Sequence, residues 1–379
     1  MNALKNIPAN LVEAESHFLL TVPALTSNFI HKIKDGVKIK GPVIEGIFKR
    51  GINSSIKRNG DAYKRPGKLV QFSTFFNHIV AEKLIFRKLR RIWGPNIEFF
   101  VGGGALLDIK QQQFFKAIGV PVFQGYGLTE AAPIISTNTP FCHKMGTSGK
   151  ILNGLVCKIC DENNIELPKG KRGEIVVKGD NVMKAYYKNT EASADVLKDG
   201  WLYTGDLGYF DEDDFLVVVG REKALLISDD GEKYSPEEIE EAIVNSSNII
   251  NQAMIYNDHK KSTTALLTLD KNKVEELIKK EEIFTSDEII RRTKQELLHF
   301  KEVDEFKGKF PEKWIPANFQ IIEEEFSESN KMINSTLKMV RHRITETYQD
   351  RLDVMYKPSA QKNSVEENRK IIKRLFTIK

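Results

Sequence analysis

The chain has 379 residues, of which 41% are hydrophobic and 29% are charged. This composition excludes a disordered, collagen-like or disulfide-scaffold protein and leaves room for two or three domains. Lys and Arg number 57 against 52 Asp and Glu, and this formal net charge of +5 is too small to indicate nucleic acid as a partner. With three cysteines and no apolar stretch near the roughly 20 residues that span a bilayer, we expect a soluble, cytoplasmic protein without a signal peptide.

The first hundred residues are predicted to be mostly helical. Residues 76–93 carry apolar side chains every three or four positions with basic residues between them, as in an amphipathic helix. Next come a short apolar segment ending in three glycines (97–104), a helical stretch (108–119) and a second apolar run (120–127). Strand, helix and strand in this order predict a βαβ unit with parallel strands.

From Gly146 the pattern changes to short segments that alternate or run apolar, at 155–160, 173–179 and 215–220. Turn residues separate these segments, which predicts a small antiparallel β unit. The pattern changes again near 220–223, where we place a domain boundary.

Beyond this boundary a helix is expected from Ser235 and Pro236, with Ser235 as its N-cap and Pro236 at its first position. Strands are expected at 252–256 and 264–269, and a charged helical region is expected to reach about residue 306. The end of the chain reads as a charged tail with one helix.

Two Gly-rich segments of the first half could carry chemistry. In 102–108 (GGGALLD) the glycines would let the backbone approach a flat ligand, although a simple tight turn has the same composition. In 124–133 (QGYGLTEAAP), Tyr126 could stack on a base, Thr129 could donate to a phosphate oxygen and Glu130 could bind Mg²⁺. A loop with a capping Thr-Glu pair explains the second segment equally well.

Two further segments follow in the second half. Asp206, in the Thr-Gly-Asp turn of 200–223, could accept both hydroxyls of a ribose, and Arg221 lies one strand later. A solvated surface turn is the alternative for Asp206. Segment 231–243 (GEKYSPEEIEEAI) is at least the capped start of a helix.

The order and spacing of these four segments resemble the adenylate-forming (AMP-binding) superfamily, and within it the long-chain acyl-CoA synthetases. The strongest stretch, 199–240, is similar to the family's DGW-x-x-TGD turn, G-R-x-K segment and G-E-x-x-x-P-x-x-I-E segment. The resemblance implies an α/β fold that corresponds to the C-terminal part of the synthetase large domain, followed by a small mobile α+β domain. The divisions expected from it are a βαβ sheet region (1–145), a β-barrel-like unit (146–220), the mobile domain (221–350) and a charged tail (351–379).

The resemblance also assigns roles to individual residues of the four motifs. The nucleotide-binding positions it implies are Gly103, Gly104 and Ala105 on the adenine side, Tyr126, Gly127, Thr129 and Glu130 in the segment that binds the nucleotide and Mg²⁺, and Asp206 with Arg221 at the ribose. Lys223 corresponds to the family's hinge between domains, and Gly231 and Glu232 correspond to the loop that approaches the reaction centre when CoA binds.

The family's catalytic lysine lies in an N-G-x-L-T-P-T-x-K pattern, which the stretch 330–338 (NKMINSTLK) resembles. Lys338 is therefore the candidate. The family's Gly, Thr and Pro are replaced by Lys331, Asn334 and Ser335. The alternative is a lysine in a basic surface helix.

The activity implied is ATP-dependent conversion of a fatty acid to an acyl-adenylate with Mg²⁺, followed by transfer to CoA. The family's upstream phosphate loop has no counterpart in the sequence, so we expect weak or no turnover by this chain alone, with a complementing N-terminal polypeptide or self-association as possible partners. The charged segment 270–320 resembles the corresponding segment of the long-chain type of synthetase.

Two alternative functions remain open from the sequence. One is a non-catalytic remnant that acts as an interaction or ligand-sensing module, and the other is the adenylation part of a carrier-protein-loading enzyme.

Two remaining features, a pair of cysteines and a basic stretch, do not favour a specific binding site. Cys157 and Cys160 lack the second pair that a structural zinc site needs, and they fit positions of a β segment. The basic stretch 82–91 could contact the inner membrane face peripherally, although a solvated, partly core-facing helix is favoured.

Overall fold

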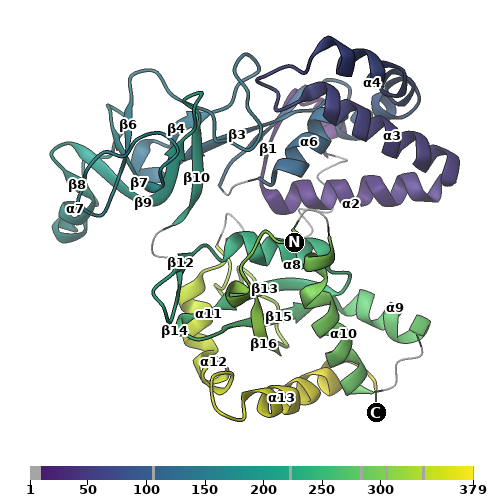
Figure 1. Cartoon of the computed structure of the whole chain (residues 1–379), viewed down its shortest axis with the longest axis vertical. Helices are drawn as coiled ribbons and strands as arrows, with labels where there is room; N and C mark the ends of the chain where they lie inside the picture. The colour runs from purple at the N-terminus through teal and green to yellow at the C-terminus, as the bar shows by residue number, and fades with distance from the viewer. Residues whose placement is uncertain are drawn as a thin grey trace. The chain divides into compact units, whose positions relative to one another are not determined.

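The computed structural model describes residues 10–104, 107–221, 224–281, 285–303, 306–334 and 338–378. The chain forms two compact units, Met1–Val219 and Gly220–Lys379, and both appear in Figure 1. Among the described residues, no helix combines the length and the apolar character needed to cross a membrane.

The first sheet of the first unit has five strands. Their order is β1 (Phe18–Thr21), β2 (Phe99–Gly102), β3 (Val122–Gly127), β4 (Ile134–Thr137) and β5 (Lys150–Ile151). The pairs β1–β2 and β2–β3 are parallel, whereas β3–β4 and β4–β5 are antiparallel. Helix α6 (Ile109–Ala117) connects β2 to β3, and the Asp108 side chain caps it by accepting from the Lys110 backbone N–H at 2.7 Å. The predicted βαβ unit is therefore confirmed.

Helices α2 (Pro23–Ile39), α3 (Pro42–Asn59) and α4 (Lys68–Ala81) accompany this sheet (Figure 1). After α4 the helix continues as a π-helical turn, η1 (Glu82–Phe86), then as α5 (Arg87–Arg90) and a 3₁₀ turn, η2 (Arg91–Trp93). The core between the sheet and the helices is aromatic, with Phe86, Trp93, Phe100 and Phe115 fully buried.

The sequence predicts mostly helix over the first hundred residues, but Phe18–Thr21 form strand β1. The Phe18 ring stacks on Phe99 of the neighbouring strand with centroids 5.9 Å apart, so strand pairing overrides the local helical pattern. The helix α2 starts only at Pro23, whose fixed φ suits a first helical position.

The second sheet of the first unit has the order β10 (Leu216–Arg221), β9 (Trp201–Phe210), β7 (Gly173–Lys178) and β6 (Val156–Cys160). The last two residues of β10, Gly220 and Arg221, already belong to the second unit. A short strand, β8 (Leu197–Lys198), also pairs with β9, and helix α7 (Thr190–Val196) precedes it. The pairs β6–β7 and β7–β9 are antiparallel, as predicted.

The core of the second unit is a three-stranded sheet with the order β13 (Ile250–Tyr256), β15 (Thr263–Leu269) and β16 (Pro316–Ile321). The pair β13–β15 is antiparallel and β15–β16 is parallel. The other elements of this unit are β11 (Leu226–Ser228), β12 (Lys233–Tyr234), α8 (Glu237–Ser246), β14 (Asp258–Lys260), α9 (Lys271–Glu281), α10 (Ser286–Leu298), η5 (His299–Glu302), η6 (Glu312–Trp314), α11 (Arg341–Thr347), α12 (Gln349–Val354) and α13 (Ala360–Leu375).

Two sequence expectations about this unit need correction. Ser235 is not an N-cap: Pro236 occupies the cap position of α8, and the Ser235 hydroxyl donates to the Glu237 carboxylate instead of accepting a backbone bond. The expected charged tail is an integral part of the unit, because α13 buries Ile371 and Ile372 in the core. Its charged residues lie on the other faces of an amphipathic helix.

Candidate functional site

The two sheets of the first unit are joined where Tyr126 meets Asp206. The Tyr126 hydroxyl, near the end of β3, donates to Oδ2 of Asp206 in β9 at 2.7 Å. Asp206 is only 6% exposed. Burial, and then the charge of Asp206, raises the pKa of Tyr126, so the phenol stays protonated and can only donate to the carboxylate.

Thr204, Gly205 and Asp206 lie within strand β9 and not in the turn expected from the sequence, and bonds to β7 fix this part of the strand. The Thr204 hydroxyl donates to the Ile175 carbonyl at 2.7 Å, and the Gly205 N–H donates to the Glu174 carboxylate at 2.8 Å. Gly205 has a φ of +66°, which glycine adopts at little cost. The Thr-Gly-Asp sequence therefore holds a nearly buried carboxylate on a fixed backbone.

Thr129 and Glu130 lie in a 3₁₀ turn, η3 (Thr129–Ala131), directly after β3. A Cβ at Gly127 would come within 1.9 Å of the Pro133 carbonyl oxygen, so only glycine allows this close return of the chain. Thr129 is exposed and Glu130 is half-buried.

Two residues that the sequence analysis did not single out hold this turn. The Tyr186 hydroxyl donates to Oε1 of Glu130 at 2.8 Å, and the Asn181 amide donates to the Ala131 carbonyl at 2.6 Å. Both partners lie about fifty residues away along the chain, and no spacing pattern in the sequence marked them.

Glu130 fits a Mg²⁺ ion that is shared with a phosphate ligand. Among the described residues, no group of three or more His, Cys, Asp and Glu side chains could hold a metal ion. Mg²⁺ commonly takes one or two carboxylates and completes its shell with water and substrate phosphates. A single carboxylate beside an exposed threonine suits that arrangement and not a site made of protein ligands alone.

Gly103 and Gly104 follow the end of β2. A Cβ at either position would meet no atom within 4 Å. Gly104 has a φ of +81°. Protein packing therefore does not require glycine at 103, which leaves the backbone open to an approaching ligand. Ala105 lies outside the described residues.

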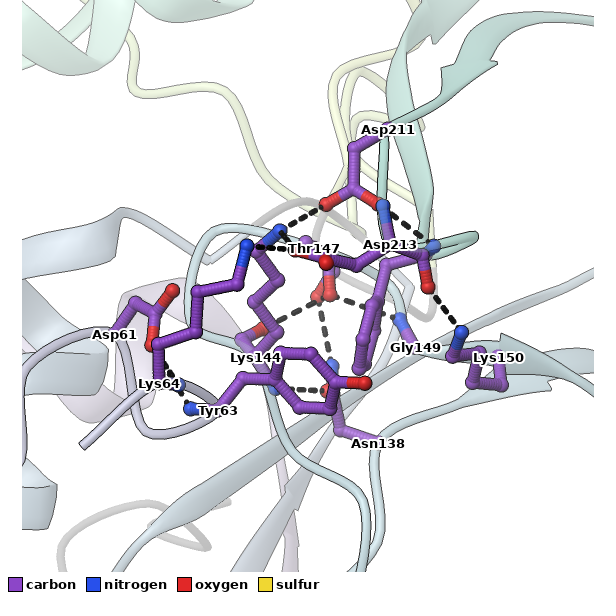
Figure 2. A network of polar contacts seen from close by, with 11 residues as sticks. Asp61, Tyr63, Lys64, Asn138, Lys144, Thr147, Gly149, Lys150, Asp211 and Asp213 are labelled. Atoms are coloured by element: carbon purple, nitrogen blue, oxygen red, sulfur yellow. Dashed lines mark hydrogen bonds and ion pairs between the residues drawn. The ribbon is translucent and has the colours of Figure 1, made fainter. Parts of the chain in front are cut away.

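A cluster of charges around Lys144, shown in Figure 2, ties the turn between β9 and β10 to the rest of the first unit. The Lys144 ammonium contacts Asp211 at 2.6 Å and Asp213 at 2.7 Å, and Lys64 contacts Asp213 at 2.9 Å. Burial disfavours the charged form of Lys144, but its two carboxylate partners raise its pKa above the ordinary value. In turn, Lys144 and Lys64 lower the pKa of Asp213 to about 2.

The loop that carries Lys144 is itself rigidly bonded. The Asn138 amide donates to the Thr147 carbonyl at 2.8 Å, while its oxygen accepts from the Lys144 backbone N–H at 2.9 Å (Figure 2). The Ser148 N–H then donates to the Leu216 carbonyl at 2.7 Å. These contacts thus hold the turn of the hairpin and the first residue of β10, and the first strand of this hairpin, β9, contains Asp206.

The remaining predicted site residues belong to the second unit. Arg221 is the last residue of β10 and is exposed. Gly231, with a φ of +83°, lies in an exposed turn closed by a bond from the Ser228 N–H to the Glu232 carbonyl at 3.0 Å. Lys313 lowers the pKa of Glu232. Lys223 lies outside the described residues.

Lys338 is exposed and does not lie in a helix, so the surface-helix alternative is wrong. Its backbone N–H donates to the Asn334 side chain and its carbonyl accepts from the Asn334 N–H, both at 2.9 Å. Three residues later, Arg341 forms an ion pair with Glu240, and the second Glu240 oxygen accepts from the Ile255 N–H at 2.7 Å. This buried pair anchors the segment that follows Lys338 to α8 and β13.

The structure therefore brings Tyr126 and Asp206 into direct contact and places Thr129 and Glu130 on the turn next to Tyr126. Arg221, Gly231 and Lys338 belong to the other unit, and their approach to Asp206 stays a prediction.

Two family models match the chain. The model described as AMP-binding enzyme matches residues 62–187, and the model described as AMP-binding enzyme C-terminal domain matches residues 223–360. The chain belongs to the adenylate-forming, AMP-binding superfamily.

Relatives of this AMP-binding family member include two proteins of Arabidopsis thaliana. Probable acyl-activating enzyme 16 is 32% identical over 76% of this chain and 42% of its own length. The long-chain-fatty-acid–[acyl-carrier-protein] ligase AEE15 is 31% identical over 74% of this chain and 38% of its own length. The chain thus spans less than half the length of these relatives.

Solved structures support the same fold. The adenylation domain of a carboxylate reductase from Mycobacterium chelonae has a TM-score of 0.66 at 20% identity, covering 94% of this chain and 49% of that one. The O-succinylbenzoate CoA synthetase of Bacillus subtilis, in complex with ATP and magnesium, has a TM-score of 0.50 at 28% identity, covering 65% of this chain and 46% of that one.

Proposed function

We propose that this family member takes part in activating a fatty acid with ATP and transferring the acyl group to CoA. The observation that carries the proposal is the nearly buried Asp206 carboxylate, which Tyr126 contacts at 2.7 Å and which lies on a part of β9 fixed by bonds to β7. A fixed carboxylate of this kind suits a pair of sugar hydroxyls, because its two oxygens offer about four acceptor positions and the bond from Tyr126 uses one of them. The long-chain ligase among the relatives supports a long-chain acid as the substrate.

In this proposal the residues of the first unit bind the nucleotide. Asp206 accepts from the ribose hydroxyls, the backbone at Gly103, Gly104 and Ala105 passes beside the adenine, and the turn of Thr129 and Glu130 faces the phosphates. Mg²⁺ bound at Glu130 would supply positive charge to the phosphate oxygens. Gly127 maintains this turn, because any larger residue would collide with Pro133.

The residues of the second unit act on the reacting atoms. An oxygen of the fatty acid carboxylate attacks the α-phosphorus, the bond to pyrophosphate breaks, and Lys338 neutralises the negative charge that builds up. In the second step the CoA sulfur attacks the acyl carbonyl, AMP leaves, and the turn at Gly231 faces the incoming thiol. In this proposal Arg221 binds the ribose together with Asp206. Lys223 is the hinge at which the second unit rotates between the adenylation step and the thiol-transfer step.

The second candidate is transfer of the acyl group to the phosphopantetheine thiol of a carrier protein. It is favoured by the acyl-carrier-protein ligase among the relatives. The first step is the same, and only the thiol differs. An assay that offers CoA and a carrier protein in parallel separates the two candidates.

The adenylation step is tested by exchange of labelled pyrophosphate into ATP in the presence of fatty acids of different lengths. We expect weak exchange that depends on the acid, because the family's upstream phosphate loop has no counterpart in the sequence. Lys338→Ala should reduce this exchange to the level measured without acid, because a charge that stabilises the transition state is removed. Lys331→Ala, in the same exposed loop, is the matched control and should keep the parent rate. Equal rates in the two variants, or exchange without any acid, would contradict the proposal.

A further inference from the structure

Helix α4 presents an apolar face to solvent. Leu69, Phe72, Phe75 and Phe76, which together form the α4 aromatic face, are 87%, 86%, 55% and 76% exposed. Their spacing of three and four residues places them along one side of the helix. Soluble proteins seldom expose aromatic side chains in such a row without a partner.

The opposite side of α4 is the polar one, and it packs against α3. The Ser55 hydroxyl lies 2.8 Å from Nδ1 of His78, Thr74 is buried, and Arg58 and Gln71 exchange bonds between side chain and backbone. A Cβ at Gly51 of α3 would collide with Ala81, so the two helices approach closely. The helix is therefore held by polar and small residues, and its aromatic face takes little part in the core.

The sequence around this face is strongly basic. Residues 30–93 hold sixteen Lys and Arg against four Asp and Glu, whereas the rest of the chain has seven more acidic than basic residues. Lys68 begins α4, and Lys83, Arg87 and Lys88 follow it on the same continuous helix, all exposed. A second copy of the chain would bring a face of the same charge, which disfavours self-association here.

We propose that the α4 aromatic face docks on the surface of a lipid bilayer that contains anionic headgroups. The aromatic and leucine side chains enter the boundary between headgroups and acyl chains, and the surrounding Lys and Arg contact lipid phosphates. The inference goes beyond the proposed reaction, and its test uses neither ATP nor an acyl substrate.

The test is cosedimentation with vesicles of pure phosphatidylcholine and with vesicles that contain about 30% phosphatidylglycerol, whose negative surface potential attracts Lys and Arg. We expect the chain to bind the anionic vesicles, to bind less as salt is raised, and to bind pure phosphatidylcholine weakly. The double variant Phe72→Ser/Phe76→Ser should lower the partition coefficient at least about tenfold. The matched control is Phe141→Ser, which removes a phenylalanine that is 99% exposed elsewhere in the same unit.

Circular dichroism and the melting temperature establish that both variants are folded, as expected for exposed positions. A second variant, Lys83→Glu/Arg87→Glu, should also lose binding to anionic vesicles. The proposal is overturned if the parent chain does not bind anionic vesicles, or if the α4 variants bind as well as Phe141→Ser. It is also overturned if the parent is a dimer that Phe72→Ser/Phe76→Ser converts to a monomer, because the face would then be a protein interface.

Discussion

His143 is buried without a hydrogen-bond partner for either ring nitrogen among the described residues. Its ring meets Phe123 edge to face, with centroids 5.0 Å apart. Burial lowers the pKa of His143 to about 4, with a further contribution from the charge of Lys116. The folded protein therefore keeps this imidazole neutral at a pH where an unfolded chain would protonate it.

This residue predicts a pH dependence of stability. The unfolded imidazole titrates near 6.5 and the folded one near 4, so the contribution of His143 is present above pH 6.5 and is lost as the pH falls toward 4. The full loss is about 3 kcal/mol. Urea unfolding of the parent and of His143→Phe between pH 4 and 8 should show a much flatter profile for the variant. Parallel profiles would contradict the assignment.

Tyr126 was predicted from its motif as a residue that stacks on a base, and the structure adds a bond that the motif could not reveal. Its partner Asp206 is eighty positions away along the chain. Replacing Tyr126 by Phe keeps the ring and removes the donor to a buried carboxylate, so we expect a loss of about 1–3 kcal/mol in unfolding free energy. Tyr209→Phe, in the same strand as Asp206, is the control and should change stability by less than about 0.5 kcal/mol. Equal losses would show that the bond contributes nothing specific.

At the scale of elements, the spacing of apolar residues predicted the helices and strands whose pattern is local in the sequence. The βαβ unit and the antiparallel β segments follow from alternating and continuous apolar runs. Strand β1 was not predicted within the mostly helical first hundred residues, and α13 was predicted only as a helix of a charged tail. The pairing of Phe18 with Phe99 and the burial of Ile371 arise only in the folded chain. The exposure of the α4 aromatic face was not predicted either. Periodicity shows that a helix has an apolar and a polar face, but it does not show which face packs against the rest of the protein.

The Lys144 cluster supports a prediction about the β9–β10 hairpin. Lys144→Met would leave Asp211 and Asp213 close together without their shared cation, and it should lower the melting temperature of the first unit by a few degrees. Because the hairpin begins with the strand that carries Asp206, affinity for an adenylate should fall as well. Lys171→Met, which removes an exposed lysine, is the control. A variant that melts and binds like this control would show that the cluster does not position the hairpin.

At the scale of the whole molecule, the predicted site residues are divided between two units. Those of the first unit lie on two sheets joined by the bond from Tyr126 to Asp206, and Lys338 lies on an exposed loop of the second unit, three residues before the anchored Arg341. The motifs predicted these candidate residues, because each motif is a short local stretch of sequence. The helpers Tyr186, Asn181 and Glu240 were not identified, because their roles depend on contacts between distant segments.

The central claim, that Asp206 binds the sugar of an adenylate, is tested most directly by calorimetric titration with a non-hydrolysable acyl-adenylate analogue. We predict binding by the parent chain and a loss of at least about tenfold in affinity for Asp206→Asn, since a charge-assisted hydrogen bond to a hydroxyl is weakened. Asp195→Asn, an exposed aspartate of α7 in the same unit, should bind like the parent. Failure of the parent to bind the analogue, or equal affinity of the two variants, would contradict the account.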